Sequence, residues 1–225
     1  MPETIALAEL NDAAVIATTI DRIVESLRKG EVIVLPMEHA YVFACDAFAH
    51  DAVAKIHTLR GDDYGTAAQV LIGSVQTLDG ISQNTPEELH ALAMKFWPGM
   101  LTLQVTPHMG LNWDLGDHGE LSEFAVRIPN QEFIVELLKK SGPLAMASAS
   151  LAGRPAISAI DQIIVLHSDI SFFVDNGTLP EGPASTVVRY KVHGHEAGVE
   201  VVRVGAISLA EMADVVPEIA SSAAN

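Results

Sequence analysis

Five arginines of this chain lie at positions that are more typical of an anion-binding site than of a solvated helix surface. Arg60, Arg127, Arg154, Arg189 and Arg203 fall in or beside turns that contain Gly or Pro, or in short apolar strands. The chain has 13 basic against 29 acidic residues, so its cations are few and their placement is informative. The guanidinium group matches the planar geometry of carboxylates and phosphates. This placement indicates an anion-binding site.

Two other groups of residues could carry different chemistry. Cys45 with His39 or His57 could form a thiol–imidazole nucleophile pair, although a cysteine in an apolar strand is typical of a core. The segment 193–196, His-Gly-His-Glu, could hold a metal ion or simply form a polar hairpin turn. Both alternatives remain open from the sequence.

The elements that must position these side chains alternate between helix and strand. Apolar spacing predicts helices over 19–27, 51–59, 85–97, 131–140 and 157–166, and a capping-box pattern begins a short helix at Ser208. Apolar runs predict strands near 32–35, 41–47, 68–72, 101–105, 124–128, 144–147, 172–174, 186–190 and 199–204.

This order of elements predicts one α/β domain built on a mixed sheet. The last strands have too few residues between them for parallel crossovers, which require a dozen residues or more. We expect a lead-in over 1–18, the domain over 19–214 and a flexible tail over 215–225.

The composition excludes several classes of protein. Hydrophobic residues make up 49% of the chain, which excludes disorder from a lack of apolar content. No apolar run reaches the roughly 18 residues of a membrane span, and the N-terminus lacks the pattern of a signal peptide. A lone cysteine, Cys45, fits a reducing cytoplasm, where we expect the protein to reside. The net charge of −16 disfavours general binding of nucleic acid.

Neither of the two common nucleotide-binding motifs is present. The first predicted strand is not followed by G-x-G-x-x-G, and the chain has no G-x-x-x-x-G-K-[ST]. A Rossmann dinucleotide site and a P-loop are therefore not supported.

Seven short motifs occur in order between residues 20 and 206. They are LPMEHAY at 35–41 with CDA at 45–47, AKIHTLRG at 54–61, WPGMLTL at 97–103, AVRIP at 125–129, SASLAG at 148–153, ASTVV at 184–188 and VRVGA at 202–206. In this order the chain resembles the YrdC-like family, the threonylcarbamoyl-adenylate synthases. The resemblance implies a twisted open mixed α/β sheet with flanking helices and a large concave groove.

The resemblance also implies an activity. Members of the family combine ATP, L-threonine and bicarbonate to give threonylcarbamoyl-adenylate and pyrophosphate, with Mg²⁺ assisting. The product feeds the modification of an adenosine beside the tRNA anticodon, so tRNA-modification proteins are the implied partners and no membrane is involved.

The resemblance assigns site residues position by position. It assigns catalytic and ATP-binding roles to Arg60, which stands where the family has lysine, and to Ser148 and Ser150, the latter in place of asparagine. It adds Arg203 to the ATP-binding residues. It assigns binding of the amino acid to Met37, His39, Arg127 and Ser185. Arg127, Ser185, Thr186 and Arg203 are unchanged from the family's pattern.

Asp62 and Asp63 depart from the family's pattern, because they stand where it has arginine and proline. A unit charge pair at about 4 Å is worth on the order of 4 kcal/mol at an effective dielectric near 20, so a free Asp62 would repel a triphosphate. The two carboxylates could instead hold Mg²⁺, or form a solvated acidic turn.

Met37 and His39 replace two threonines of the family's pattern. Met37 supplies no hydroxyl, so the site could take a different small substrate, or none. His39 could act as a general base or be a partly buried structural histidine.

Two functions follow from these observations. The first is a threonylcarbamoyl-adenylate synthase-type nucleotidyltransferase, with an altered substrate left open. The second is a catalytically degenerate YrdC-like paralogue that binds a nucleotide, an RNA element or a protein. The RNA version requires a local basic groove against the net charge of −16.

Overall fold

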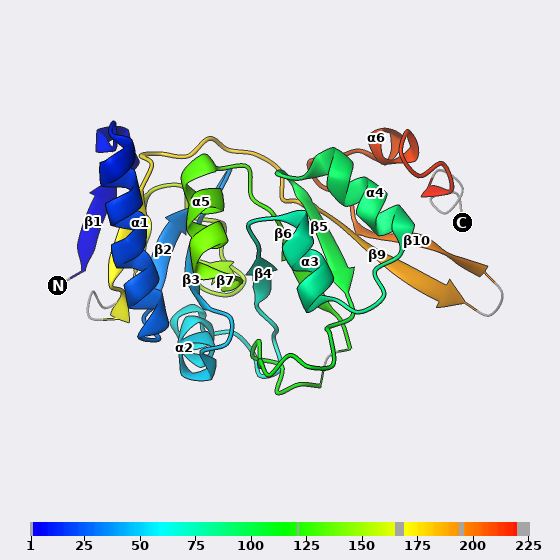
Figure 1. Ribbon diagram of the computed structural model, residues 1–225, viewed down its shortest axis with the longest axis horizontal. Coiled ribbons are helices and arrows are strands. Elements are labelled where there is room, and N and C mark those ends of the chain that lie inside the picture. The colour runs from blue at the N-terminus through cyan, green and yellow to red at the C-terminus, as the bar shows by residue number, and fades with distance from the viewer. Residues whose placement is uncertain (1, 121, 165–168, 194–195, 220–225) are drawn as a thin grey trace.

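The computed structural model describes residues 2–120, 122–164, 169–193 and 196–219, and ten strands form its central feature (Figure 1). The strands are β1 Glu3–Ala6, β2 Ile33–Pro36, β3 Tyr41–Asp46, β4 Gln69–Leu71, β5 Leu101–Val105, β6 Phe124–Arg127, β7 Leu144–Ser148, β8 Phe172–Asp175, β9 Thr186–His193 and β10 Glu196–Arg203. The helices are η1 Leu7–Glu9, α1 Ala13–Arg28, α2 His50–Arg60, α3 Val75–Ile81, α4 Glu87–Phe96, α5 Glu132–Ser141, η2 Ile160–Gln162 and α6 Leu209–Ala213.

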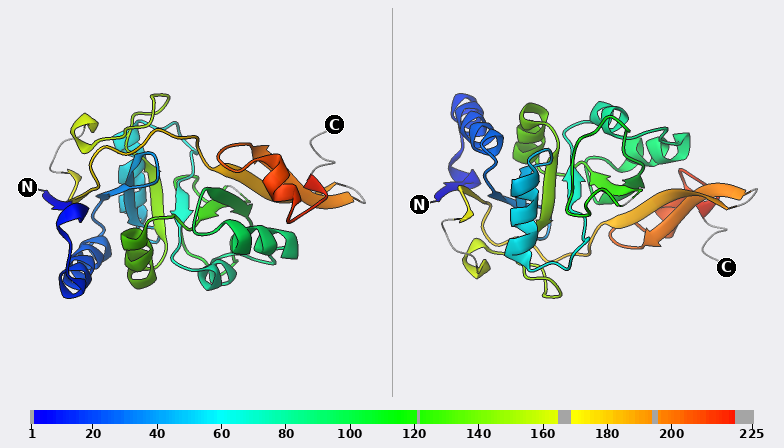
Figure 2. Two further views of the ribbon diagram at one scale, coloured as in Figure 1. Left: turned by 90° about the horizontal axis from the view of Figure 1, so that it is seen from above. Right: turned by 90° about the horizontal axis from the view of Figure 1, so that it is seen from below.

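All ten strands belong to one open mixed sheet, which confirms the predicted fold class. Their order is β1-β8-β2-β3-β7-β4-β6-β5-β9-β10. The β1–β8, β2–β8, β4–β6 and β5–β9 pairs are parallel, and the other neighbours are antiparallel. The C-terminal β9–β10 ribbon projects from one end of the molecule (Figure 2). Within the described residues, no helix has the length and apolar character to cross a bilayer.

Two apolar clusters cover the two faces of the sheet. Along β2, Ile33 and Leu35 join a cluster with α1 and α5, whereas Val34, with Val32 just before the strand, joins a second cluster that contains buried residues of α2. Successive side chains of a strand point to opposite faces, so α1 and α5 lie on one face and α2 on the other (Figure 2).

The predicted lead-in is part of the sheet domain, which corrects the expectation for residues 1–18. Strand β1 pairs in parallel with β8, with Ile5 opposite Val174. Helix α1 begins at Ala13 because the side chain of Asp12 accepts hydrogen bonds from Ala14 N at 2.7 Å and Val15 N at 3.2 Å. A strand of four residues is too short to give a reliable alternation in the sequence.

Three further elements bear on the predictions. Helix α3 was not expected; Ser74 caps it by accepting from Thr77 N at 3.3 Å. The predicted helix over 157–166 is reduced to η2 in the described residues, and 165–168 lie outside them. The capping box at Ser208 is confirmed.

The expected tail is also shorter than predicted. Val216 and Ile219 are buried in the larger apolar cluster, so residues 215–219 pack against the domain. Residues 220–225, the remainder of the predicted tail, lie outside the described residues.

Candidate functional site

A cavity of about 400 Å³ opens where the β2–β3 turn, the ends of β6 and β7, and the segments around 183 and 203 converge. Six residues that the sequence predicted for the site line it: Met37, His39, Arg127, Ser148, Ser185 and Arg203. Segments more than 160 residues apart in the chain are thus brought to one wall, because β2, β3, β7, β4, β6, β5 and β9 follow one another across the sheet. This cavity is the candidate functional site.

Arg127 is held by a carboxylate that the sequence did not predict as a site residue. Its Nη2 lies 2.7 Å from Oε2 of Glu38 and its Nη1 lies 3.3 Å from Oε1. The side chains are 6% and 12% exposed, so the pair is buried. Asn130 N also donates to Glu38 Oε1, at 2.9 Å. The positive charge of Arg127 therefore reaches the cavity already balanced by Glu38.

Arg203 is held differently, by neutral groups. Its Nε and Nη2 donate to the carbonyl oxygen of Ser185 at 3.2 and 3.0 Å, and Nη2 also donates to the Ser185 hydroxyl at 3.3 Å. Among the ion pairs of the described residues, none involves Arg203. Arg203 thus brings an unbalanced positive charge to the cavity.

Ser185 and Thr186 have separate tasks at the start of β9. The Ser185 hydroxyl lies 2.8 Å from Oγ1 of Thr102, which also accepts from Gln69 Nε2 at 3.1 Å. Thr186 is fully buried; its hydroxyl donates to Ile207 O at 2.7 Å and accepts from two backbone N–H groups of the 205–207 segment. Ser185 lines the cavity, whereas Thr186 fixes the chain that follows Arg203.

A second arginine–carboxylate pair lies where α2 ends. Arg60 Nε lies 2.9 and 3.0 Å from the two carboxylate oxygens of Asp62, and His57 Nδ1 lies 2.8 Å from Oδ2. His57 Nε2 contacts Leu115 O at 2.8 Å. The Asp62 side chain is only 5% exposed. Asp62 is therefore neutralised by Arg60 and held by His57, and it does not present the free charge that the sequence suggested.

Arg60 connects this turn to the end of β7. Its Nη1 donates to Ser148 O at 3.2 Å, and the Ser148 hydroxyl lies 2.9 Å from the Ser150 hydroxyl. Ser150 lines a neighbouring cavity of about 290 Å³ together with Leu59 and Arg154. Of the three predicted catalytic residues, Arg60 thus contacts Ser148, which lines the main cavity, and Ser148 contacts Ser150.

Asp62 and Asp63 do not fit a magnesium site. The Asp62 oxygens already contact Arg60 and His57, and Asp63 is exposed on the following turn. No group of three or more His, Cys, Asp or Glu side chains in the described part of the chain could hold a metal ion.

The alternative chemistries find no support in the geometry. Cys45 is fully buried in β3, and burial raises the pKa of its thiol far above the usual range, which makes it a core residue. His39 Nδ1 contacts Pro180 O at 3.1 Å, and the His39 ring packs so closely on Gly182 that a Cβ there would overlap it. The predicted metal group at 193–196 includes positions outside the described residues.

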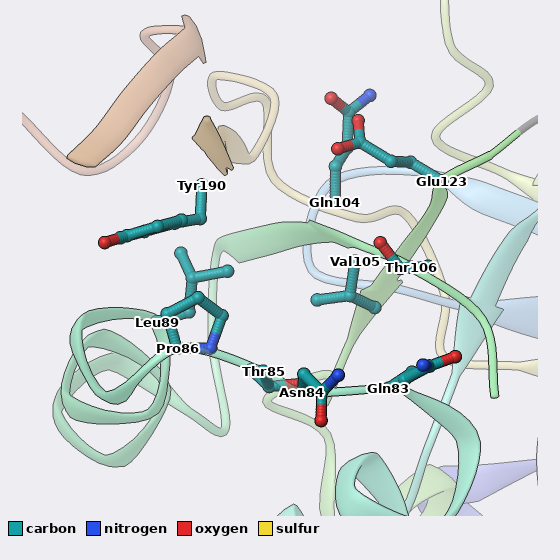
Figure 3. Close-up of a pocket in the computed structure, with 10 residues that line it drawn as sticks. All are labelled: Gln83, Asn84, Thr85, Pro86, Leu89, Gln104, Val105, Thr106, Glu123 and Tyr190. Carbon is teal, nitrogen blue, oxygen red and sulfur yellow. The ribbon is translucent and has the colours of Figure 1, made fainter. Parts of the chain in front are cut away.

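A separate cavity of about 260 Å³ lies between the α3–α4 connection, β5 and Tyr190 (Figure 3). It is lined by Gln83, Asn84, Thr85 and Thr106 among others, and by none of the residues predicted for the site. The carbonyl oxygen of the Gln104 side chain is buried there without a hydrogen-bond partner among the described residues.

Comparison with known proteins places the chain in a family. Residues 25–205 match the Sua5/YciO/YrdC family model, described as "Telomere recombination". A Mycobacterium leprae protein is 33% identical over 201 residues, which cover 88% of each chain. The Bacillus subtilis protein named threonylcarbamoyl-AMP synthase is 31% identical over 72% of this chain and 47% of its own length.

Solved structures agree with the sequence comparison. The crystal structure of Pyrococcus abyssi Sua5 complexed with L-threonine superposes with a TM-score of 0.80 at 25% identity, covering 97% of this chain and 61% of that one. The chain therefore spans about three fifths of that protein. Escherichia coli YciO has the same fold, with a TM-score of 0.75 at 20% identity over 94% of this chain and all of its own. This chain belongs to the Sua5/YciO/YrdC family.

Proposed function

We propose that this protein is a threonylcarbamoyl-AMP synthase-type nucleotidyltransferase that joins ATP, a small amino acid and bicarbonate. One observation carries the proposal: a single cavity gathers Arg127, Ser148, Ser185 and Arg203, with Arg60 at its edge. Relatives that carry the synthase name support it, as does the structural relative described with L-threonine.

The reaction has two steps. The amino group captures bicarbonate as a carbamate with loss of water. A carbamate oxygen then attacks the α-phosphorus of ATP; a new P–O bond forms, the bond to the bridging oxygen of the β-phosphate breaks, and pyrophosphate leaves. Such a transfer depends on positioning the reactants and on balancing their negative charge, rather than on a covalent enzyme group.

The proposed roles follow the geometry. Arg203, the unbalanced cation, binds phosphate. Arg60, although paired with Asp62, offers its guanidinium at the Ser148–Ser150 edge, where the two hydroxyls orient the triphosphate. Arg127, Ser185, Met37 and His39 surround the amino acid. No residue of the chain is assigned to Mg²⁺.

The proposed setting is tRNA modification in the cytoplasm. Threonylcarbamoyl-AMP is an activated mixed anhydride, which an acyl-transfer step onto the tRNA adenosine must consume. The proteins of that step are the proposed partners.

Pyrophosphate release tests the proposal. The protein is supplied with ATP, Mg²⁺, bicarbonate and a panel of small amino acids that includes L-threonine and L-valine. We expect release that depends on both bicarbonate and an amino acid. Replacement of Arg203 by alanine should reduce kcat/KM by about 100-fold, the effect typical of losing one charged contact in the transition state.

A second candidate is favoured by the carboxylates that balance two of the three site arginines. Asp62 and Glu38 reduce the positive charge available to a triphosphate. A protein that binds ATP by calorimetry but releases no pyrophosphate with any amino acid is the degenerate nucleotide-binding paralogue. A protein that does neither overturns both candidates.

A further inference from the structure

The wall of the candidate cavity contains an apolar patch made by Met37, Val42, Met100 and Met146. Met37 and Val42 are each only 4% exposed. Thioether and methyl groups offer no hydrogen-bond donor and at most a weak acceptor. This part of the wall, which we call the methionine patch, is suited to an aliphatic group.

The sheet places the methionine patch within the proposed amino-acid subsite. Val42 in β3 is directly opposite Ser148 in β7, and Met146 lies two residues before Ser148, on the same face of the sheet. Met100 Sδ lies 3.2 Å from Arg127 Nη1. Met37 immediately precedes Glu38, the residue that pairs with Arg127. The patch therefore belongs to the proposed amino-acid subsite and reaches as far as Ser148, one of the residues proposed to hold phosphate.

Apart from Arg203, whose charge has no counter-ion among the described residues, five polar side chains of the same cavity already have partners within the chain. Arg127 pairs with Glu38, and the Ser148 hydroxyl with that of Ser150. The other polar contacts are Ser185 with Thr102, Gln69 with Thr102, and His39 with Pro180 O. A substrate hydroxyl set against the methionine patch would lose its bonds to water without gaining an equivalent partner.

We propose that this subsite selects an amino acid whose side chain is aliphatic and lacks a hydroxyl, with Met37 setting the preference. The inference rests on the proposed function, because it concerns the amino acid of that reaction. L-Valine is the sharpest probe, since it has the shape of L-threonine with a methyl group in place of the hydroxyl. Apolar pockets discriminate between such isosteres by a factor of up to about 100.

The experiment compares kcat/KM for L-valine and L-threonine in bicarbonate-dependent pyrophosphate release. We expect the wild-type protein to favour valine by about 10- to 100-fold. Met37→Thr adds a hydroxyl partner and should bring the ratio to about 1 or below. Met37→Leu keeps the apolar surface and should retain the preference for valine, which also provides a folded reference if Met37→Thr is unstable.

Met94→Thr is the matched control. Met94 is 70% exposed on α4 and does not line the cavity, so the same exchange there should leave the ratio unchanged.

The possible failures are distinguishable. A wild-type kcat/KM for threonine that equals or exceeds the value for valine overturns the inference and leaves the proposed function intact. If no amino acid of the panel supports pyrophosphate release, the proposed function is overturned instead. Calorimetric titration with L-valine and L-threonine in the presence of ATP then decides the inference by itself: tighter binding of threonine, or binding of neither, overturns it.

Discussion

The two arginine–carboxylate pairs beside the cavity have similar burial but different origins. Asp62 is two residues from Arg60 in the turn after α2, whereas Glu38 is 89 residues from Arg127. The first pair is therefore local: it orients an arginine that already lies at the end of its own helix. The second pair joins the β2–β3 turn to the end of β6, and so contributes to the tertiary fold as well as to the site. Similar pairs near one cavity can thus serve different purposes.

Breaking the Glu38–Arg127 pair should have the largest effect on the free energy of unfolding. Glu38→Ala leaves the guanidinium of Arg127 buried without its counter-charge, and it leaves Asn130 N without its acceptor. Removing one partner of a buried pair typically costs about 3–5 kcal/mol of unfolding free energy. Denaturant titration monitored by circular dichroism measures this cost.

Glu136→Ala is the matched control for that variant, because Glu136 pairs with Lys139 on the exposed surface of α5. Its effect should stay within about 0.5 kcal/mol, as is usual for surface pairs. A cost below about 1 kcal/mol for Glu38→Ala would contradict the structural role of Glu38.

Breaking the local pair should have a smaller effect on stability and a diagnostic effect on binding. Asp62→Asn removes the charge that Arg60 and His57 contact, and hydrogen bonds to charged groups contribute about 1.5–3 kcal/mol each. We expect a loss of about 2 kcal/mol on that basis. Asp63→Asn changes an exposed neighbour and should lie within about 0.5 kcal/mol of the wild-type protein.

The sign of the change in ATP affinity separates two roles for Asp62. A carboxylate that positions Arg60 predicts that the Kd for ATP rises in Asp62→Asn. A carboxylate that merely repels phosphate predicts that the Kd falls. Calorimetry with ATP and Mg²⁺ on both asparagine variants decides between them.

The sequence predicted the sheet and most of the cavity, and what it missed has physical reasons. The motifs that carry Arg127, Ser148, Ser185 and Arg203 converge on one wall, as the family resemblance implied. Glu38 was not predicted as a site residue, because a pair formed across 89 residues leaves no local signal in the chain.

The sequence suggests a free charge at Asp62, because it does not reveal the one backbone conformation on which the surroundings of Asp62 depend. Gly61 ends α2 in the left-handed region, with φ of 65°, and Asp62 N then bonds back to His57 O at 3.1 Å. That bend returns the carboxylate to Arg60 and His57. A glycine in the sequence indicates that a helix ends, but not which side chain the following turn directs inward.

One pair of glycine substitutions tests whether the left-handed backbone conformation at Gly61 governs the turn that presents Asp62. Gly61→Ala places a Cβ in the left-handed region, which costs about 1–2 kcal/mol, although no atom would obstruct it. Gly80 is inside α3, also without obstruction, so Gly80→Ala should stabilise the protein by up to about 1 kcal/mol. Thermal or chemical denaturation should show opposite signs for the same exchange. Equal effects would show that backbone conformation at Gly61 does not govern the turn.

The exposed Arg189–Glu200 pair on the C-terminal ribbon should contribute least to stability, and its contribution can be tested by varying the pH. Arg189 donates hydrogen bonds to Glu200, which lower the pKa of that carboxyl, with both side chains substantially exposed. Because the folded-state pKa is depressed, the stabilisation is present above the usual carboxyl pKa and disappears as the pH falls through the lowered value. Glu200→Gln should therefore cost about 0.2–1 kcal/mol at neutral pH, and this difference from the wild-type protein should shrink to zero in acid. A difference that persisted in acid would mean that Glu200 stabilises the ribbon through packing instead of charge. The smaller stability cost at Glu200 than at the buried Glu38 and Asp62 would then reflect position in the fold rather than exposure of the ions.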